Sequence, residues 1–510
     1  MYSSKSAFIQ FSFLLYRTKW FRLFLSAIAG LLLFMSFPPV AAGLLCYVAL
    51  VPFLLAVFSS PNWKVTIGCG LITGIVFYTL SLSFMVDFFG VLGFAFANSL
   101  TLYMPLFAVS IYFVARKIGI KRTFWFIPVF WVGIEYFRAE VIILKFPWLA
   151  LGYSQSPYLW MIQICEIIGV YGLSFLIVVI NVLFAYWILE RFRNDDLKPL
   201  KPIIAVLIFA FVLVYGLFRY QYTPKHKRDN SVPTIPVAVV QDWIGSLENY
   251  IRVTHETINS PRETLVVWPE SAVKEGLSNV LNRTLIEGLV KDKKLYLVFG
   301  TFEQTDEVIR FNNLVVLFSP DGVLLGKYAK RVPVPFIETL VTPGDKWGIF
   351  ETPLARLGVL TCYEAGFSNL ATWLVRKRGI EVLVIPTLEV GEWGGLSHKH
   401  HASMMPIRAV ETRRPILRSA ALGVSMIVHP SGKIEGQLDS MASGVLRGEI
   451  SKATKMTFYV KYGYLFQRLC TDIYGLLLGL VIAVWVIRKL PGGERLIDYI
   501  KTLPQMRKFD

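Results

Sequence analysis

Long uninterrupted apolar stretches dominate the first 218 residues of the chain. Residues 23–63 contain no charged side chain at all. Because one membrane-spanning helix needs about 20 apolar residues, this stretch is long enough for two helices, divided at Pro38-Pro39. The same reasoning predicts further spans, so that the full set lies near residues 20–37, 40–58, 65–86, 91–115, 123–138, 164–189, 202–218 and 469–487. The pattern therefore predicts a polytopic α-helical membrane domain of about eight spans.

Between residues 220 and 465 the pattern changes to short β-branched runs that alternate with helical periodicity. Such alternation is typical of an α/β domain whose strands are buried on both faces. The predicted strands are Ile235–Gln241, Thr264–Trp268, Leu295–Phe302, Leu314–Phe318, Leu357–Cys362, Val382–Pro386 and Val424–Val428. The predicted helices lie near 246–260, 273–291, 366–378 and 398–413. We therefore divide the chain into a membrane domain with seven helices (1–218), a hydrophilic α/β domain (219–468) and a C-terminal helix with its tail (469–510).

The composition supports a membrane protein. Hydrophobic residues make up 55% of the chain, above the ~45–50% of soluble domains. Charged residues make up 17%, below the usual ~25%. These values exclude an ordinary cytosolic enzyme and a disordered chain. Five cysteines in 510 residues are too few for a disulfide scaffold.

The net charge of +17 is explained by the predicted topology. Basic clusters beside membrane helices remain in the cytoplasm. With eight alternating spans, one side holds Lys5 to Arg22, Lys64, Arg116–Arg122, Arg191–Lys201 and Arg488-Lys489. Arg138 and Lys145 fall on the other side, together with the hydrophilic domain. We therefore expect that domain outside the cytoplasm, and we expect no nucleic-acid partner.

An aromatic segment, Phe146–Gln155, lies between the fifth and sixth predicted spans and is too short to cross a membrane. Tryptophan and tyrosine side chains favour the headgroup region of a bilayer. The segment is therefore either a simple aromatic belt or a re-entrant arm that lines an entry for lipid. The pattern leaves both readings open.

Cys362 is the cysteine that falls outside the predicted spans and the residues beside them. It ends the strand Leu357–Cys362, and Gly366 follows where we expect a helix to begin. A thiol at a strand end, near helix N–H groups, is expected to have a lowered pKa and to be accessible to substrate. A buried structural thiol is the alternative reading.

A thiol nucleophile needs a base and a group that stabilises the oxyanion. Glu270 follows a buried strand, which places its carboxylate at the strand ends where α/β sheets carry their sites. Lys330 leads into a mostly apolar, proline-rich segment. His398, His400 and His401 lie close together, but their spacing differs from the i, i+4 pair of metal-binding helices. We expect neither a metal nor a cofactor.

Glu, Lys and Cys in this order resemble the nitrilase superfamily, whose catalytic set is Glu–Lys–Cys and whose fold is an αββα sandwich. The resemblance implies that Glu270 is the general base, that Lys330 stabilises the oxyanion and that Cys362 is the nucleophile. A nitrilase-like domain joined to eight membrane helices resembles the apolipoprotein N-acyltransferase family in particular. The matching segments are Phe146–Gln155, Trp268-Pro269-Glu270, Lys330 to Glu338, Cys362-Tyr363-Glu364, Arg408 to Glu411 and Arg414 to Ser419.

The resemblance also implies an activity and further site residues. Glu338 and Glu364 become essential carboxylates, and Tyr363 lines the site. The implied reaction transfers a fatty acyl chain from a membrane phospholipid to the N-terminal diacylglyceryl-cysteine of a lipoprotein, through a thioester on Cys362. The implied location is the bacterial inner membrane, with the catalytic domain on the periplasmic side. A membrane-tethered amidohydrolase with the same three residues is the alternative enzyme, and a non-enzymatic scaffold or transporter is the alternative class.

The chain departs from the family pattern at several positions. The segment Thr387 to Gly394 stands where the family usually has Asn-Asp-Ala-Trp-Phe-Gly. Val332 replaces a histidine and Ile337 replaces a glycine in the loop after Lys330. Ala420 to Leu422 replace polar residues. These differences concern the loop geometry and the docking of the acceptor more than the three catalytic positions.

Overall fold

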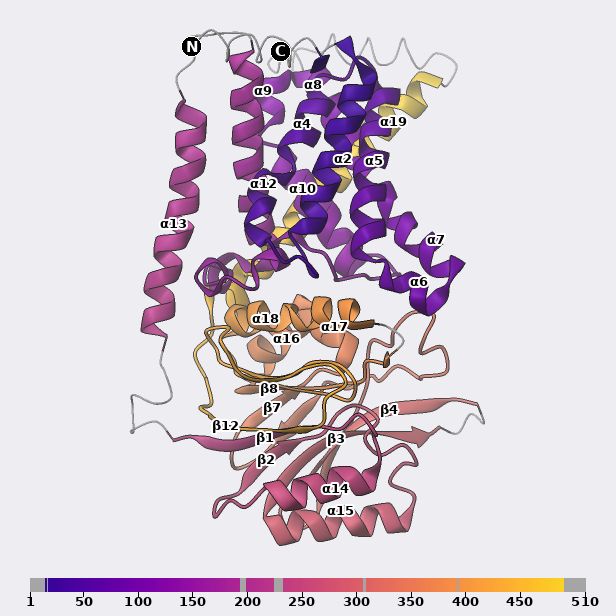
Figure 1. Cartoon of the computed structure of the whole chain (residues 1–510), viewed down its shortest axis with the longest axis vertical. Helices are drawn as coiled ribbons and strands as arrows, with labels where there is room; N and C mark the ends of the chain where they lie inside the picture. Colours follow the sequence, from indigo (N-terminus) through magenta and orange to yellow (C-terminus); the bar gives the residue numbers. More distant parts are fainter. Residues whose placement is uncertain are drawn as a thin grey trace.

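The structure, a computed structural model, consists of a helical bundle stacked on an α/β domain (Figure 1). It describes residues 14–192 except 16, and residues 199–223, 233–305, 309–391 and 394–489. Of the basic residues used to predict the topology, Lys5, Arg193 and Lys198 lie outside the described residues, as does the tail after 489.

The helical part is formed by the segments before residue 223 and after residue 458. Its elements are α2 (Lys19–Met35), η1 (Gly43–Leu45), α3 (Cys46–Ala49), α4 (Val51–Phe58), α5 (Trp63–Ser81), α6 (Phe84–Phe89), α7 (Val91–Ser99), η2 (Leu100–Leu102), α8 (Tyr103–Ile118), α9 (Ile120–Thr123), α10 (Ile127–Tyr136), η3 (Phe137–Val141), η4 (Leu151–Gln155), α11 (Leu159–Ile162), α12 (Cys165–Arg191), α13 (Leu200–Tyr222), η7 (Tyr459–Gly463) and α19 (Tyr464–Lys489). In Figure 1, α9 and the first turns of α13 lie at the end of the bundle away from the α/β domain.

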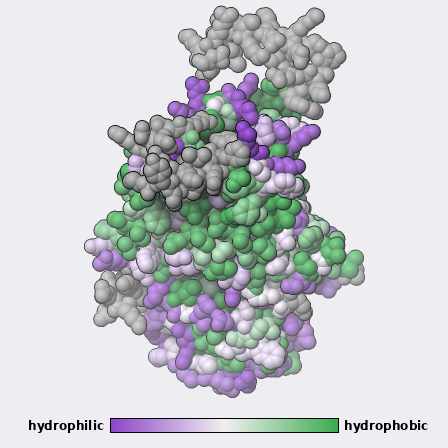
Figure 2. All heavy atoms as spheres, turned by 45° about the horizontal axis from the view of Figure 1, so that its top comes forward, coloured by the Kyte–Doolittle hydropathy of each residue, from purple (hydrophilic) through white to green (hydrophobic). Residues whose placement is uncertain are grey.

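Several of these helices are suited to a membrane. Among the described residues, five segments are long and apolar enough to cross one: 63–81, 91–118, 165–191, 200–222 and 459–484. The predicted spans near 20–37, 40–58 and 123–138 correspond to shorter helical segments, since α2 has 17 residues and α10 has 10. Figure 2 shows apolar residues gathered in a broad band around the bundle, whereas hydrophilic residues cover much of the α/β domain. The multi-pass membrane architecture is confirmed, with an approximate number of spans.

The α/β domain contains two six-stranded sheets. The first has the order β12-β1-β2-β3-β4-β5 and the second the order β11-β10-β9-β8-β7-β6. The strands are β1 (Ile235–Gln241), β2 (Thr264–Val267), β3 (Leu295–Gln304), β4 (Phe311–Phe318), β5 (Leu324–Ala329), β6 (Ile349–Glu351), β7 (Arg356–Val359), β8 (Val382–Thr387), β9 (Ile416–Ala420), β10 (Ser425–Val428), β11 (Ile434–Leu438) and β12 (Gly444–Ile450). The first and last strands pair antiparallel, with Ile235 opposite Ile450.

Apolar side chains from both sheets meet between them, including Val239, Val267, Val384 and Leu417. Helices α14 (Leu247–Thr257) and α15 (Val280–Lys293) cover the outer face of the first sheet. Helices α16 (Ser368–Arg378), α17 (Gly394–Ala402) and α18 (Met404–Thr412) cover the second sheet and face the membrane helices (Figure 1). The four layers form the expected αββα sandwich, so the predicted fold class is confirmed.

Two predicted helices differ from the observed ones for local reasons. The helix predicted at 398–413 is two helices, because Pro406 has no N–H and is tolerated only in a first turn; α18 begins at Met404. The helix predicted at 273–291 begins instead at Val280. The side chain of Asn279 caps it by accepting hydrogen bonds from the N–H groups of Leu281 and Asn282.

Buried charged groups join the bundle to the α/β domain. Glu140 of η3 accepts hydrogen bonds from the N–H groups of Ser368 (3.2 Å) and Asn369 (3.3 Å), at the start of α16. A carboxylate is favourable there because the first N–H groups of a helix lack partners within it. Glu411 of α18 in turn accepts the N–H of Val170 at 2.8 Å. The two parts are therefore fixed to each other through polar contacts as well as apolar packing.

Candidate active site

Cys362 lies just beyond β7 in a tight 3₁₀ turn, Cys362–Gly366, that leads into α16. Its backbone φ is 48°, a conformation that non-glycine residues rarely adopt and that recurs at functional sites. The thiol is buried, with a relative exposure of 3%. Its Sγ lies 3.4 Å from the carbonyl oxygen of Leu388.

The thiol is held in its protonated form. Burial and the negative charge of Glu270 raise the pKa of Cys362 well above its usual value, and the ammonium of Lys330 opposes this only in part. The sequence-based expectation of an accessible thiol with a lowered pKa is therefore wrong. Desolvation outweighs any contribution of helix N–H groups, so this thiol needs a base before it can react.

Glu270, Lys330 and Glu338 form one cluster, in which Glu270 and Lys330 are buried and Glu338 is partly exposed. Glu270 follows β2, and Lys330 follows β5. The Nζ atom of Lys330 lies 3.0 Å from Oε1 of Glu270 and 2.8 Å from Oε2 of Glu338. Asn313 of β4 donates to Oε1 of Glu270 at 2.7 Å and to Oε1 of Glu338 at 2.9 Å. Both carboxylates raise the pKa of Lys330 against the opposing effect of burial, so the side chain is an ammonium.

The backbone of a single residue, Leu388, connects this cluster with the thiol. Leu388 donates its N–H to Oε2 of Glu270 at 2.8 Å, and its carbonyl faces the Sγ of Cys362. Lys330 is ion-paired with the same carboxylate, so the thiol and the ion pair both contact Leu388 or its hydrogen-bond partner. The structure thus brings together the three residues that the sequence singles out from distant parts of the chain.

Glu364 and Tyr363 have different surroundings. Glu364 is fully buried and faces the backbone of the loop after Lys330, where it accepts the N–H groups of Arg331 (2.8 Å) and Val332 (3.0 Å). It also accepts the hydroxyl of Tyr328 at 2.9 Å. Val332 replaces the family's histidine, and its backbone N–H is one of the groups that hold the Glu364 carboxylate. Tyr363 donates its hydroxyl to the carbonyl of Lys145 in the helical part.

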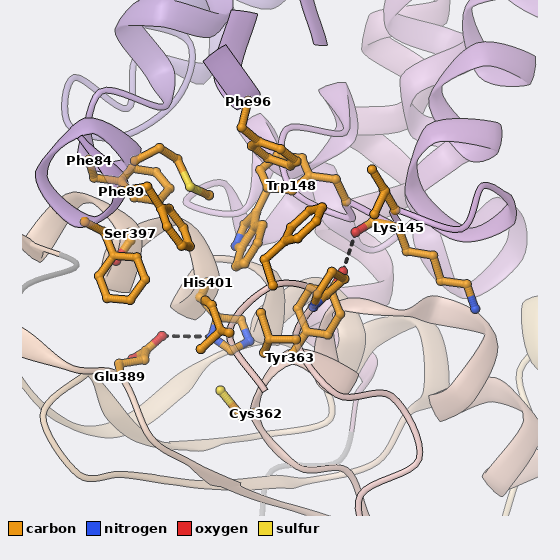
Figure 3. Close-up of a pocket in the computed structure, with 18 of the residues that line it drawn as sticks. Phe84, Phe89, Phe96, Lys145, Trp148, Cys362, Tyr363, Glu389, Ser397 and His401 are labelled. Carbon is orange, nitrogen blue, oxygen red and sulfur yellow. Dashed lines mark hydrogen bonds and ion pairs between the residues drawn. The ribbon is translucent and has the colours of Figure 1, made fainter. Parts of the chain in front are cut away.

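An apolar pocket of about 420 Å³ lies above Cys362, between the two parts of the molecule. Its walls come from α6, α7, the Phe146 segment and the loop after Lys330 (Figure 3). The lining residues include Phe84, Phe89, Phe96, Trp148, Phe336, Ile337 and Tyr363. In Figure 3 Cys362 lies at the bottom of the pocket, below His401 and Trp148. Phe146 is only 2% exposed, so the Phe146–Gln155 segment packs inside the protein rather than forming a simple aromatic belt.

Four buried polar residues around this site have no predicted role in it: Asn313, Glu389, His401 and Arg418. Asn313 directly precedes the apolar run Leu314–Phe318 of β4, and this position at the end of a buried run is the one sign of it in the sequence. His401 was considered as a metal ligand and not as a neighbour of Cys362. Among the described residues, no group of three or more His, Cys, Asp or Glu side chains is arranged to hold a metal ion. Glu392 and Trp393 of the segment that departs from the family lie outside the described residues.

Two families match different parts of the chain. Residues 29–183 match the apolipoprotein N-acyltransferase N-terminal domain. Residues 247–456 match the carbon-nitrogen hydrolase family. This match covers the α/β domain except β1, and it includes Glu270, Lys330 and Cys362. A solved structure, the carbon-nitrogen hydrolase from Helicobacter pylori G27, is 19% identical and covers 46% of this chain and 92% of its own, with a TM-score of 0.38.

Relatives of similar length match both parts together. An apolipoprotein N-acyltransferase from Geobacter metallireducens is 31% identical over 488 residues, which cover 88% of this chain and 92% of the relative. Another, from Chlorobaculum tepidum, is 25% identical over 527 residues, covering 90% of this chain and 96% of the relative. The match extends over the bundle, the α/β domain and the connections between them. The chain belongs to the apolipoprotein N-acyltransferase family.

Proposed function

We propose that the chain transfers a fatty acyl chain from a membrane phospholipid to the α-amino group of an N-terminal diacylglyceryl-cysteine on a lipoprotein. The observation that carries this proposal is the location of Cys362, beside Glu270 and Lys330 and at the bottom of an apolar pocket shared with the membrane helices. A lipid chain fits such a pocket, because its lining is almost entirely hydrocarbon and aromatic. The names of the relatives support the same acceptor.

In the first half-reaction Glu270 accepts the thiol proton as Cys362 attacks the ester carbonyl of the phospholipid. The S–C bond forms, the tetrahedral intermediate collapses, and the lysophospholipid alcohol leaves with the proton from Glu270. The raised pKa of Cys362 explains why a base is required. The product is a thioester between the fatty acid and Cys362.

Lys330 stabilises the oxyanion of this intermediate. An ammonium has three N–H donors, and its two carboxylate partners leave one for a substrate oxygen. Because the cluster is buried, a fixed positive charge acts more strongly there than in water. Glu338 and Asn313 hold Lys330 and Glu270 in position, while Glu364 and Tyr363 order the loop and the pocket wall.

In the second half-reaction the amine of the acceptor attacks the thioester carbonyl. An N–C bond forms, the C–S bond breaks, and the thiol of Cys362 is restored. Both substrates are anchored in the bilayer, so the apolar pocket favours them over water.

The basic helix ends support an orientation for the chain. Arg116 to Arg122 lie at the end of the bundle remote from the α/β domain. By the positive-inside rule this end is cytoplasmic, so the catalytic domain lies on the periplasmic side of the bacterial inner membrane. We keep the division into a membrane domain (1–218), a catalytic domain (219–468) and a C-terminal helix (469–510) as part of the proposal.

The test is intact-mass analysis of the purified full chain incubated with vesicles of dipalmitoyl phosphatidylethanolamine. We expect one palmitoyl adduct on the unmodified chain and none on Cys362→Ala. Cys470→Ala, which removes another buried thiol away from the pocket, is the matched control and should acquire the adduct. An adduct on Cys362→Ala would overturn the assignment. Ammonia release from small amides without acyl transfer to a diacylglyceryl-cysteine peptide would favour the amidohydrolase instead.

A further inference from the structure

The pocket above Cys362 contains a positive charge to which the reaction described above gives no role. Among the described residues that line the pocket, one is a lysine, Lys145, and one is an acid, Glu389. Glu389 has its own partners, since a guanidinium nitrogen of Arg418 and Nδ1 of His401 each lie 2.8 Å from its Oε1. The Nζ atom of Lys145 has no carboxylate and no hydrogen-bond acceptor beside it in the part of the chain that the structure describes. A mostly apolar pocket therefore carries one ammonium without a counter-ion.

The backbone of Lys145 is connected to the residue that follows the nucleophile. Its carbonyl oxygen accepts the hydroxyl of Tyr363, the next residue after Cys362. The Nζ atom lies 5.9 Å from the centroid of the Phe367 ring, and that ring packs edge-on against Tyr363 at 4.9 Å. A cation over an aromatic face is attracted to the ring. These contacts position Lys145 relative to Cys362 although more than two hundred residues separate them in the chain.

The contact with Phe367 leaves the N–H groups of Lys145 available for a ligand. An ammonium has three N–H donors and no acceptor. The ring attracts the charge through its electrons and supplies no oxygen to any of the three donors. In Figure 3 the side chain of Lys145 extends away from Cys362. Because hydrogen bonds from an ammonium to an anionic oxygen are roughly twice as strong as those between neutral groups, the ligand expected here is an anion.

The neighbours of Lys145 point to a lipid as the source of that anion. Ile143 and Leu144 directly precede it as exposed apolar side chains, and Leu144 also lines the pocket. Leu92 and Phe336 likewise line the pocket and are exposed, so these side chains mark its mouth. A lysine at a membrane surface keeps its stem along apolar groups and its charged end among the headgroups. Lys145 therefore has the surroundings of a residue that meets phospholipid headgroups.

The two sides of the pocket suit the two ends of a phospholipid. Figure 3 shows Phe84 and Phe89 on one side and Lys145 on the other, with Cys362 below and between them. The aromatic side suits an acyl chain. The phosphate of the same molecule is joined to the ester by the glycerol unit, so it must lie close to Cys362 but outside the part that holds the chain. Lys145 is on that other side.

We propose that Lys145 binds the phosphate of the donor phospholipid, an inference that rests on the acyl transfer proposed above. Its Nζ donates hydrogen bonds to the non-bridging oxygens of the phosphodiester while the ester carbonyl lies beside the Sγ of Cys362. Lys145 does not touch the reacting atoms. It determines specificity, because it strengthens the binding of donors that carry a phosphate without changing the bonds that form and break.

The test compares two donors that have the same palmitoyl esters. The full chain, in micelles of an uncharged maltoside detergent, receives dipalmitoyl phosphatidylethanolamine or dipalmitoylglycerol, which lacks the phosphate. The palmitoyl adduct is timed by intact mass at several lipid concentrations. For Lys145→Gln we expect the phosphatidylethanolamine concentration that gives half the maximal rate to rise about tenfold or more, with the maximal rate nearly unchanged. Rates with dipalmitoylglycerol should agree with those of the unmodified chain within about twofold.

Two further variants serve as controls for the charge. Lys145→Arg keeps a cation that binds phosphate, so the phosphatidylethanolamine dependence should stay within about threefold of the unmodified chain. Lys461→Gln removes an exposed lysine on η7 that does not line the pocket, and it should change neither donor's rate. Equilibrium binding of the two lipids to chains that also carry Cys362→Ala measures the same preference without the reaction. There Lys145→Gln should reduce the preference for phosphatidylethanolamine about tenfold.

The outcomes separate this inference from the proposed function. A loss confined to phosphatidylethanolamine supports it. An equal loss with both lipids overturns it, because the lysine would then act through its stem on the shape of the pocket. Unchanged acylation in Lys145→Gln, together with slower transfer of the adduct to an acidic diacylglyceryl-cysteine peptide, also overturns it, since the bound anion would belong to the acceptor. Absence of an adduct on the unmodified chain overturns the proposed function itself.

Discussion

The Nζ atom of Lys330 lies 3.0 Å from Oε1 of Glu270, although 60 residues separate them in the chain. The contact is possible because β2 and β5 belong to one sheet, with β3 and β4 between them. Glu338 completes the cluster from the loop that follows Lys330. One buried positive charge therefore holds a buried carboxylate, Glu270, and a partly exposed one, Glu338. The first prediction concerns the loss of that positive charge.

Lys330→Met should destabilise the chain and prevent acylation. Glu270 would be left as a buried charge without its cation, which costs about 3–5 kcal/mol of unfolding free energy. Loss of the oxyanion partner should slow formation of the palmitoyl-enzyme by at least about 10²-fold. Thermal unfolding in detergent and intact mass measure the two effects. Lys327→Met on the same β5 is the control, because Lys327 is 41% exposed and its surface pair is worth at most about 1 kcal/mol.

Glu364→Gln should loosen the loop after Lys330. The carboxylate accepts the N–H groups of Thr361, Arg331 and Val332, and an amide has only one oxygen with which to replace two. We expect a loss of about 1–3 kcal/mol of stability and a slower acylation. Tyr328→Phe, which removes a single donor to the same carboxylate, should cost only about 1 kcal/mol. Equal unfolding temperatures for Glu364→Gln and the unmodified chain would contradict this role.

Gly423→Ala should displace Glu389. The new Cβ would overlap Oε2 of Glu389, and adjustment of a packed core to an added methyl group costs about 1–3 kcal/mol. Displacement of the carboxylate would also weaken its contacts with His401 and Arg418, so the unfolding temperature should fall. Gly395→Ala on α17 is the control, since a Cβ there meets nothing within 4 Å. Thermal unfolding of the two variants in detergent provides the measurement.

His400 should make the chain less stable in mild acid. It is buried on α17, with its ring 6.3 Å from those of Phe37 and Phe84 in the bundle. Burial lowers its pKa from 6.5 to about 4. As the pH falls, His400 is therefore protonated in the unfolded chain at a higher pH than in the folded chain. The free energy of unfolding decreases between pH 6.5 and about pH 4, by up to about 3 kcal/mol. In His400→Gln the unfolding temperature should vary less over this range, whereas exposed His255→Gln should leave the variation unchanged.

Features that depend on local pattern could be predicted from the sequence. β1 has the predicted bounds, Ile235–Gln241, because its sequence is a short, almost entirely apolar run between polar segments. β6, with three residues, and β12, which is only partly buried, lack such a run and were not predicted. Their formation depends on neighbouring strands, which periodicity does not report.

The same division applies to the site. Glu270, Lys330 and Cys362 were found because each adjoins a recognisable apolar run and their order matches a family. The burial of the Cys362 thiol, and hence the direction of its pKa shift, depends on distant segments, such as the Leu388 backbone after β8 and the residues of the bundle that line the pocket. The pairing of Glu389 with His401 joins residues whose neighbours along the chain give no indication of it. Long-range contacts of this kind require the structure.

The pairing of β1 with β12 determines when the catalytic domain can be completed during synthesis. The first strand leaves the ribosome about two hundred residues before its partner, and until Gly444–Ile450 emerges one edge of the first sheet has no neighbour. Only then does α19 follow, so the first sheet stays incomplete until nearly the whole α/β domain has been synthesised. A stop codon shortly before residue 444 would leave an open sheet edge prone to aggregation, however intact the residues around Cys362.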